Sequence, residues 1–149
     1  MKASLLLPIV ALLSNNALAY GEAGQWSSGW GQGTTEYTAV VDAHNSLYIA
    51  CSDTTKVSMT ATVKGQEYGS YAAKGFSLIV NGSEYEAPYE TNSRVGENNF
   101  YDMWAKLRKA KSITIVTADG QKLTLPVKGA SSTLPATNTS AFSCLMWDN

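Results

Sequence analysis

The stretch from residue 99 to 127 constrains the fold of this chain most, because its apolar spacing changes from a helical period to that of a strand. Its first part carries apolar side chains on one face of an α-helix: Phe100, Met103, Trp104, Leu107 and Ala110. The pattern predicts a helix over residues 99–110, capped by Asn98 or Asn99. Burying each large side chain contributes about 1.5 to 3 kcal/mol, so we expect packing to hold this helix.

A β-hairpin is expected directly after the helix. Residues 113–117 are mostly β-branched, and an Asp-Gly pair separates them from a second apolar run at residues 123–127. A two-residue turn would place the aliphatic side chains of the two strands on opposite faces. A three-residue loop with Gly120 in the left-handed conformation instead pairs Ile115 with Leu123. We prefer the loop because it gathers the aliphatic side chains on one face, where the helix can cover them.

Short strand-like segments dominate the rest of the chain. Residues 76–80 and 83–87 flank Asn81-Gly82, which favours a tight type I′ turn. Further strands are expected at residues 37–41, 47–51, 56–63 and 142–147, with a loop at 65–75 and an irregular connection at 128–141. The sequence therefore predicts a mainly β fold, an antiparallel β-sandwich or partly open barrel, with one amphipathic helix over about 99–110.

The N-terminus has the pattern of a secretory signal peptide. A lysine, an apolar run and a small-residue site ending at Ala19 predict residues 1–19 as the signal, cleaved after Ala19. Residues 20–35 form a Gly/Trp-rich arm in which we expect no regular element, and residues 36–149 form a single domain. No other segment is long enough to span a membrane, so a periplasmic or secreted location is predicted.

The chain has two cysteines, Cys51 and Cys144. Export would expose both to an oxidising compartment, where such a pair is expected to form a disulfide. Two buried free thiols are the alternative.

Catalytic and metal-binding patterns are sparse. His44 is the single histidine and falls in a predicted turn, and no G-x-S-x-G motif is present. Glu84 and Glu86, with Glu90 nearby, could form a calcium-binding site or a catalytic pair of an acid and a base. Glutamates at alternate positions are, however, typical of a solvated strand face. We therefore predict no enzyme activity, no metal site and no cofactor.

Two sets of residues are candidates for an interface. The formal net charge of −1 gives no support for binding nucleic acid. A basic cluster at the end of the helix could instead dock an acidic protein or compensate the helix dipole: Lys106, Arg108, Lys109 and Lys111. Aromatic residues of the arm and the 65–75 loop form the other candidate, since such residues dominate binding hot spots: Trp26, Trp30, Tyr68 and Tyr71.

From about residue 76 to 134 the chain resembles the invasion-associated locus B family of exported bacterial proteins. The similarity lies in residues 100–107, 113–116 and 125–129. It implies a small periplasmic β-sandwich without catalytic residues, associated with envelope function or host interaction.

We expect a non-enzymatic secreted or periplasmic module that binds a protein of the cell envelope, as inhibitors, immunity proteins and envelope adaptors do. The alternative is a protein that binds an envelope glycan or small ligand through Trp26, Trp30 and Tyr71. A hydrolase is the third reading, and it would require His44 or the Glu84 and Glu86 pair.

Overall fold

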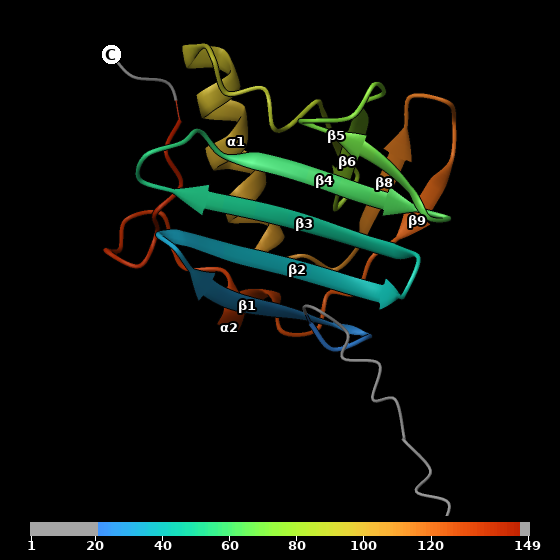
Figure 1. Cartoon of the computed structure of the whole chain (residues 1–149), viewed down its shortest axis with the longest axis horizontal. Coiled ribbons are helices and arrows are strands. Elements are labelled where there is room, and N and C mark those ends of the chain that lie inside the picture. Colours follow the sequence, from blue (N-terminus) through green and yellow to red (C-terminus); the bar gives the residue numbers. More distant parts are fainter. Residues whose placement is uncertain (1–20, 147–149) are drawn as a thin grey trace, which may run out of the picture.

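The computed structural model describes residues 21–146, which form two antiparallel sheets and two helices (Figure 1). The first sheet has the order β1-β2-β3-β4-β5. Its strands are β1 (Gln25–Gly31), β2 (Thr34–Asp42), β3 (Asn45–Ser52), β4 (Ser58–Val63) and β5 (Gln66–Gly69). The second has the order β7-β6-β8-β9. Its strands are β6 (Phe76–Val80), β7 (Ser83–Glu86), β8 (Ile113–Thr117) and β9 (Lys122–Thr124). The predicted mainly β, sandwich-like fold is confirmed, and the predicted signal peptide lies outside the described residues.

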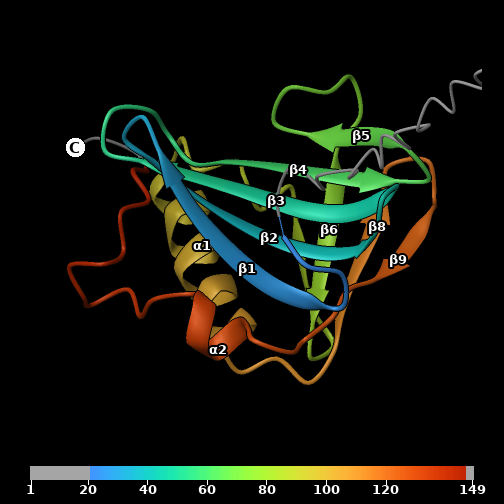
Figure 2. The ribbon, with the colours of Figure 1, turned by 60° about the horizontal axis from the view of Figure 1, so that its bottom comes forward.

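The five-stranded sheet forms one layer of the molecule. Helix α1 (Arg94–Leu107) and the four-stranded sheet lie side by side against its inner face, while the short α2 (Ala130–Thr133) lies beside β1 (Figure 2). One continuous core of buried side chains joins these elements. The apolar stripe of α1 faces this core, since Phe100, Met103, Trp104 and Leu107 are all fully buried.

The helix begins five residues earlier than its apolar pattern predicted and ends at Leu107 instead of residue 110. Ser93, and not Asn98 or Asn99, caps it, because the Ser93 side chain accepts a hydrogen bond from the Gly96 backbone N–H. The first turn adds no large buried side chain, so the apolar stripe could not reveal it. Gly96 is required there because a Cβ at this position would lie 2.2 Å from the Glu90 carbonyl oxygen.

Both hairpins have the predicted turns. Asn81 and Gly82 have φ angles of 49° and 80°, as the two-residue turn between β6 and β7 requires. Between β8 and β9, Gly120 has a φ of 87° and Ile115 pairs with Leu123. The prediction of a three-residue loop between these two strands is therefore confirmed.

Three segments differ from the sequence prediction. The Gly/Trp-rich arm is not irregular: β1 pairs with β2 along its length, which buries Trp26. Part of the 65–75 loop is strand β5, and part of the 128–141 connection is helix α2. In each case the partner in space, and not the local pattern, determines the element.

The expected terminal strand at 142–147 is not formed within its described part, residues 142–146. The segment is extended, and Leu145 donates to the Ser52 carbonyl and accepts from the Val57 N–H. The predicted disulfide is present: Cys51 of β3 is bonded to Cys144, closing a loop with a sequence separation of 93. A loop of this length corresponds to a stabilisation of about 4 to 5 kcal/mol in the chain-entropy account.

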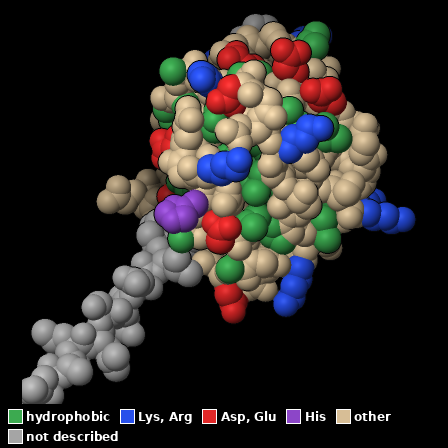
Figure 3. Space-filling model, turned by 90° about the vertical axis from the view of Figure 1, so that its right-hand side faces the viewer, with side chains coloured by type: hydrophobic (Ala, Val, Ile, Leu, Met, Phe, Trp, Pro, Cys, Tyr) green, Lys and Arg blue, Asp and Glu red, His purple; other side chains and the backbone are tan. Residues whose placement is uncertain are grey.

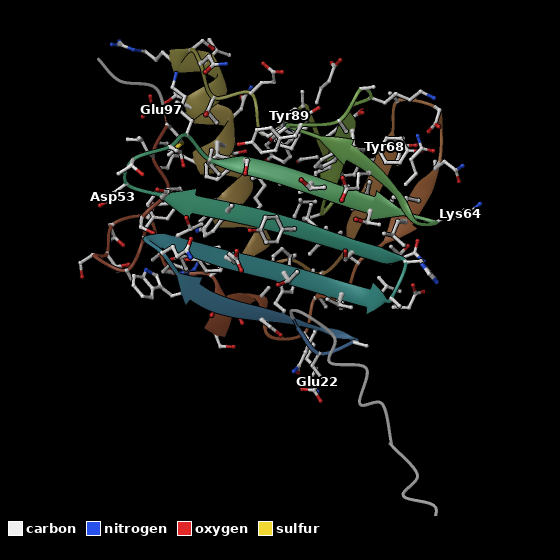
Figure 4. All side chains as sticks on the ribbon, viewed as in Figure 1. Glu22, Asp53, Lys64, Tyr68, Tyr89 and Glu97 are labelled. Atoms are coloured by element: carbon white, nitrogen blue, oxygen red, sulfur yellow. A yellow bond between two sulfur atoms is a disulfide. The ribbon has the colours of Figure 1, made fainter. Side chains whose placement is uncertain are left out.

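A polar contact joins the two sheets at the end opposite α1. The hydroxyl of Tyr68, on β5, donates to the Asp119 carboxylate in the β8–β9 loop at 3.0 Å (Figure 4). Hydrogen bonds from Thr117 and Tyr68, together with Lys74 at 3.6 Å, hold the pKa of Asp119 below its usual value. Because the pKa is lowered in the folded state, this contact stabilises the fold above about pH 4 and is lost on further acidification.

We predict that Trp104→Ala lowers the free energy of unfolding by about 3 to 5 kcal/mol, because it leaves a cavity between the helix and the five-stranded sheet. Urea denaturation followed by circular dichroism measures this loss. Val95→Ala is the matched control on an exposed part of α1 and should change stability by less than about 0.5 kcal/mol. Equal, small losses in both variants would contradict the central role of Trp104.

Candidate interaction site

The first half of strand β1 has its outer edge covered. The Trp26 backbone N–H donates to the Lys128 carbonyl at 2.9 Å, and its indole N–H donates to the Pro126 carbonyl at 2.9 Å. The Trp26 carbonyl accepts from the Thr133 hydroxyl at 3.4 Å. The segment that leads into α2 therefore occupies this part of the sheet edge.

The second half of β1 has an open edge. Main-chain groups of alternate residues point the same way in a strand, so the N–H and C=O groups of Ser28 and Trp30 point away from β2, as those of Trp26 do. No residue within 21–146 forms a hydrogen bond to these outward groups. Trp30 also presents its side chain to solvent, with 75% of it exposed. This edge is therefore free to pair with an added strand.

A groove of about 360 Å³ lies on the inner side of this open edge, and we call it the edge groove. Residues from three parts of the chain line it: Ser28, Thr35 and Tyr37 of the sheet, Arg108 at the end of α1, and Ser131 to Pro135 with Ala141. Thr35 is paired with Trp30, and strand alternation places the Trp30 side chain on the same face as Ser28. The groove therefore continues toward the exposed indole.

Arg108 supplies the charge of the edge groove. It caps the C-terminus of α1, and its Nε donates to the Leu134 carbonyl at 2.7 Å. Its two terminal guanidinium nitrogens form no hydrogen bond with the described residues. Among residues 21–146, no acidic side chain lines the groove. The remaining N–H donors of Arg108 are thus available to an anionic group.

Tyr37 supplies a neutral hydrogen-bonding group. Its ring packs edge to face on Trp104, with centroids 5.2 Å apart, and only 2% of the residue is exposed. Its hydroxyl has no hydrogen-bond partner among the described residues, yet no buried side-chain polar atom there is left unpaired. The hydroxyl therefore keeps its access to solvent through the groove. Burial raises the pKa of the phenol, which remains a donor at neutral pH.

The aromatic candidates from the sequence do not form one surface. Trp26 and Tyr68 were expected at an interface, but they are 3% and 1% exposed, so both side chains lie in the core and neither presents its ring on the surface. Tyr71 is 85% exposed but follows β5, at the opposite edge of the sheet from Trp30. The proposed sugar platform of Trp26, Trp30 and Tyr71 is therefore not assembled.

The basic candidates are also divided. Lys106 pairs with Asp102 at 3.0 Å and lies over the Tyr85 ring, while Arg108 turns into the edge groove. Lys109 and Lys111 are exposed and do not line the groove. Elsewhere, on the side shown in Figure 3, positive and negative side chains are intermixed. Arg108 thus lines the edge groove, and Trp30, from the other predicted set, lies beyond Ser28 on the same face of β1.

The residues considered for catalysis are spread over the molecule. His44 is an exposed turn residue whose backbone N–H donates to Asp42. Glu84, Glu86 and Glu90 line an open groove beside β7. Within residues 21–146, no group of three His, Cys, Asp or Glu side chains is arranged to hold a metal ion.

Sequence reasoning missed the hydroxyl groups of the edge groove. Tyr37 has the pattern of a core residue in a strand, and Ser131 to Thr133 fall in a segment interpreted as an irregular connection. The run of three hydroxyl residues after Gly129 was the one local signal, but nothing in the sequence relates it to Arg108.

The chain belongs to the YfjT family, because the family model described as YfjT matches residues 24–134. The matched range contains β1, α1 and α2, and therefore most of the edge groove. Searches of curated proteins and of solved structures gave no match.

We predict that Tyr37→Phe changes the free energy of unfolding by less than about 0.5 kcal/mol, because the hydroxyl it removes has no partner in the folded chain. Urea denaturation of the two proteins tests this expectation. A loss above about 1.5 kcal/mol would show that the hydroxyl is held inside the fold and is not available to a ligand.

Proposed function

We propose that this member of the YfjT family is a non-enzymatic, extracytoplasmic module that binds a protein partner in the cell envelope. Inhibitors, immunity proteins and envelope adaptors act in this way. The observation that carries the proposal is the edge groove, where an arginine with free donors lies beside an open strand edge that carries an exposed tryptophan further along the same face. Aromatic residues and arginine are the side chains most enriched in the centres of protein interfaces.

The proposed location rests on one observation and one prediction from the sequence. The Cys51–Cys144 disulfide is typical of proteins in an oxidising compartment. The predicted signal peptide, with cleavage after Ala19, would deliver the chain there. Neither helix in residues 21–146 has the length and apolar character needed to cross a bilayer.

The resemblance to the invasion-associated locus B family is also part of the proposal, for architecture and for an envelope role. The two-sheet fold with one long helix supports the architectural part. The family model that matches residues 24–134 of this chain is the one described as YfjT.

The central test is affinity capture from a periplasmic extract, with quantitative mass spectrometry of the captured proteins. We expect a partner that the unmodified protein retains and that Trp30→Ala loses, because removing a hot-spot tryptophan costs at least about 2 kcal/mol of binding. Tyr71→Ala is the matched control, since it removes another exposed aromatic ring at the other edge of the same sheet. A partner set that is the same in all three proteins would remove the edge groove from the proposed function.

A second candidate function is the binding of an envelope glycan at a different place. Tyr71 and Tyr89 line a pocket of about 230 Å³ together with Lys56, Glu90 and Asn92. Lys56 donates to the Asn92 side chain at 3.0 Å, which fixes two polar groups at its rim. An exposed ring beside such groups can stack on a sugar while they bind its hydroxyls.

The peptidoglycan disaccharide of N-acetylglucosamine and N-acetylmuramic acid is a direct probe of this pocket. If the pocket binds glycan, calorimetric titration should give a saturable isotherm that Tyr71→Ala abolishes and Trp30→Ala preserves. No heat of binding with the unmodified protein would exclude this disaccharide as a ligand and favour the protein-binding function.

A further inference from the structure

We infer that the edge groove takes an extended peptide segment of the partner, which pairs with β1 at Ser28 and Trp30 and places a carboxylate on Arg108. This inference rests on the proposed function and names the chemistry of the partner. It depends on three properties of the groove: its main-chain edge, its charge and its aromatic end.

The main-chain edge fits a short extended segment. Ser28 and Trp30 each present one N–H and one C=O outward, and the covered edge at Trp26 ends the run on one side. Two such residues can exchange up to about four hydrogen bonds with an added strand. A segment of about four to six residues spans this length at about 3.3 Å per residue.

The charge of the groove selects an acidic group. Arg108 is the one charged residue among the described residues that line it, and its terminal nitrogens form no hydrogen bond with any of them. A guanidinium binds a carboxylate through two parallel hydrogen bonds. The hydroxyls of Tyr37 and Ser131 offer neutral donors around the same space. The Ser132 and Thr133 hydroxyls donate to the Gly129 and Trp26 carbonyls, so toward a ligand they act as acceptors. A single cation among hydroxyls suits one carboxylate better than a polyanion.

The aromatic end gives the segment an apolar anchor. The Trp30 side chain is exposed and lies on the groove side of β1, next to Thr35. An apolar side chain two residues from the acidic one would fall on the same face of the added strand, and could pack on the indole. We therefore expect an acidic residue and an apolar residue at alternate positions of the bound segment.

A second copy of this chain does not meet these requirements through its own β1. Strand β1 has the sequence QWSSGWG and contains no acidic residue. Pairing two β1 edges would leave both Arg108 side chains without an anion. Self-pairing of β1 therefore leaves the charge of the groove unmatched, and the occupant that we propose is a segment of another protein.

Random peptides of about seven residues, displayed on phage and selected on the full chain, provide the probe. We expect enrichment of extended sequences with an acidic residue two positions from an apolar one. A selected peptide is then synthesised in three forms: unchanged, with its acidic residue replaced by the amide, and N-methylated at alternate main-chain nitrogens.

Binding of these peptides is measured by fluorescence anisotropy. Arg108→Gln should weaken binding of the unchanged peptide by about tenfold or more, whereas Lys109→Gln, the matched loss of an exposed cation outside the groove, should change it less than about twofold. The amide peptide should lose the same factor with the unmodified protein and lose nothing further with Arg108→Gln. N-methylation should abolish binding.

Ser28→Pro gives a test that does not involve Arg108. Proline removes the outward N–H of Ser28 without removing a hydrogen bond to β2, so binding should fall about tenfold or more while the fold persists. Absence of enriched peptides, or equal affinities for Arg108→Gln and the unmodified protein, would overturn this inference. A partner whose capture still depends on Trp30 would then leave the proposed function intact, whereas capture that ignores Trp30 would remove both.

Discussion

The packing of one tryptophan holds the layers of this molecule together. The Trp104 indole contacts the Tyr37 ring of the large sheet on one side and Phe142 of the C-terminal segment on another. Its N–H donates to the Pro135 carbonyl at 2.8 Å. A single buried side chain therefore contacts the large sheet and the segment after α2 at once, from its place on the helix.

The same packing shapes the edge groove. Tyr37 contributes its ring to the core and its hydroxyl to the groove, so the hydroxyl is positioned by the contact with Trp104. Arg108 is held in a similar way, because its Nε is bonded to the Leu134 carbonyl next to Pro135. The hydrogen-bond donors of Tyr37 and Arg108 are thus held in place by the fold before a ligand binds, so binding would not have to immobilise these side chains. Such preorganisation lowers the entropic cost of binding.

The sequence predicts the parts of this fold that depend on neighbours along the chain. The stripe from Phe100 to Leu107 and the turns at Asn81-Gly82 and Gly120 follow from local spacing and from backbone angles that few residues adopt. Strand β1 does not follow in this way, because its glycines disfavour a strand until β2 supplies the pairing.

The sequence predicts single residues of the candidate site, but not which of them lie close together. Trp30 and Arg108 were each selected for their residue type, but they were assigned to separate surfaces because they are far apart in the chain. The segment after α1 returns to the edge of β1 through contacts such as that between Trp26 and Lys128, and Arg108 shares a groove with Ser28 of the strand that carries Trp30. Long-range contacts of this kind leave no periodic signal. The sequence does not reveal that Trp26 and Tyr68 are buried, since the residue types that are common at interfaces also fill cores.

The Cys51–Cys144 bond has a consequence for how the protein matures. The bond links β3 to a segment that follows every other element, so it can close only after the chain has been made through Cys144. If the chain is exported as proposed, all strands and both helices have to reach the oxidising side of the membrane before the bond can form. A chain that stops before Cys144 keeps Cys51 as a free thiol.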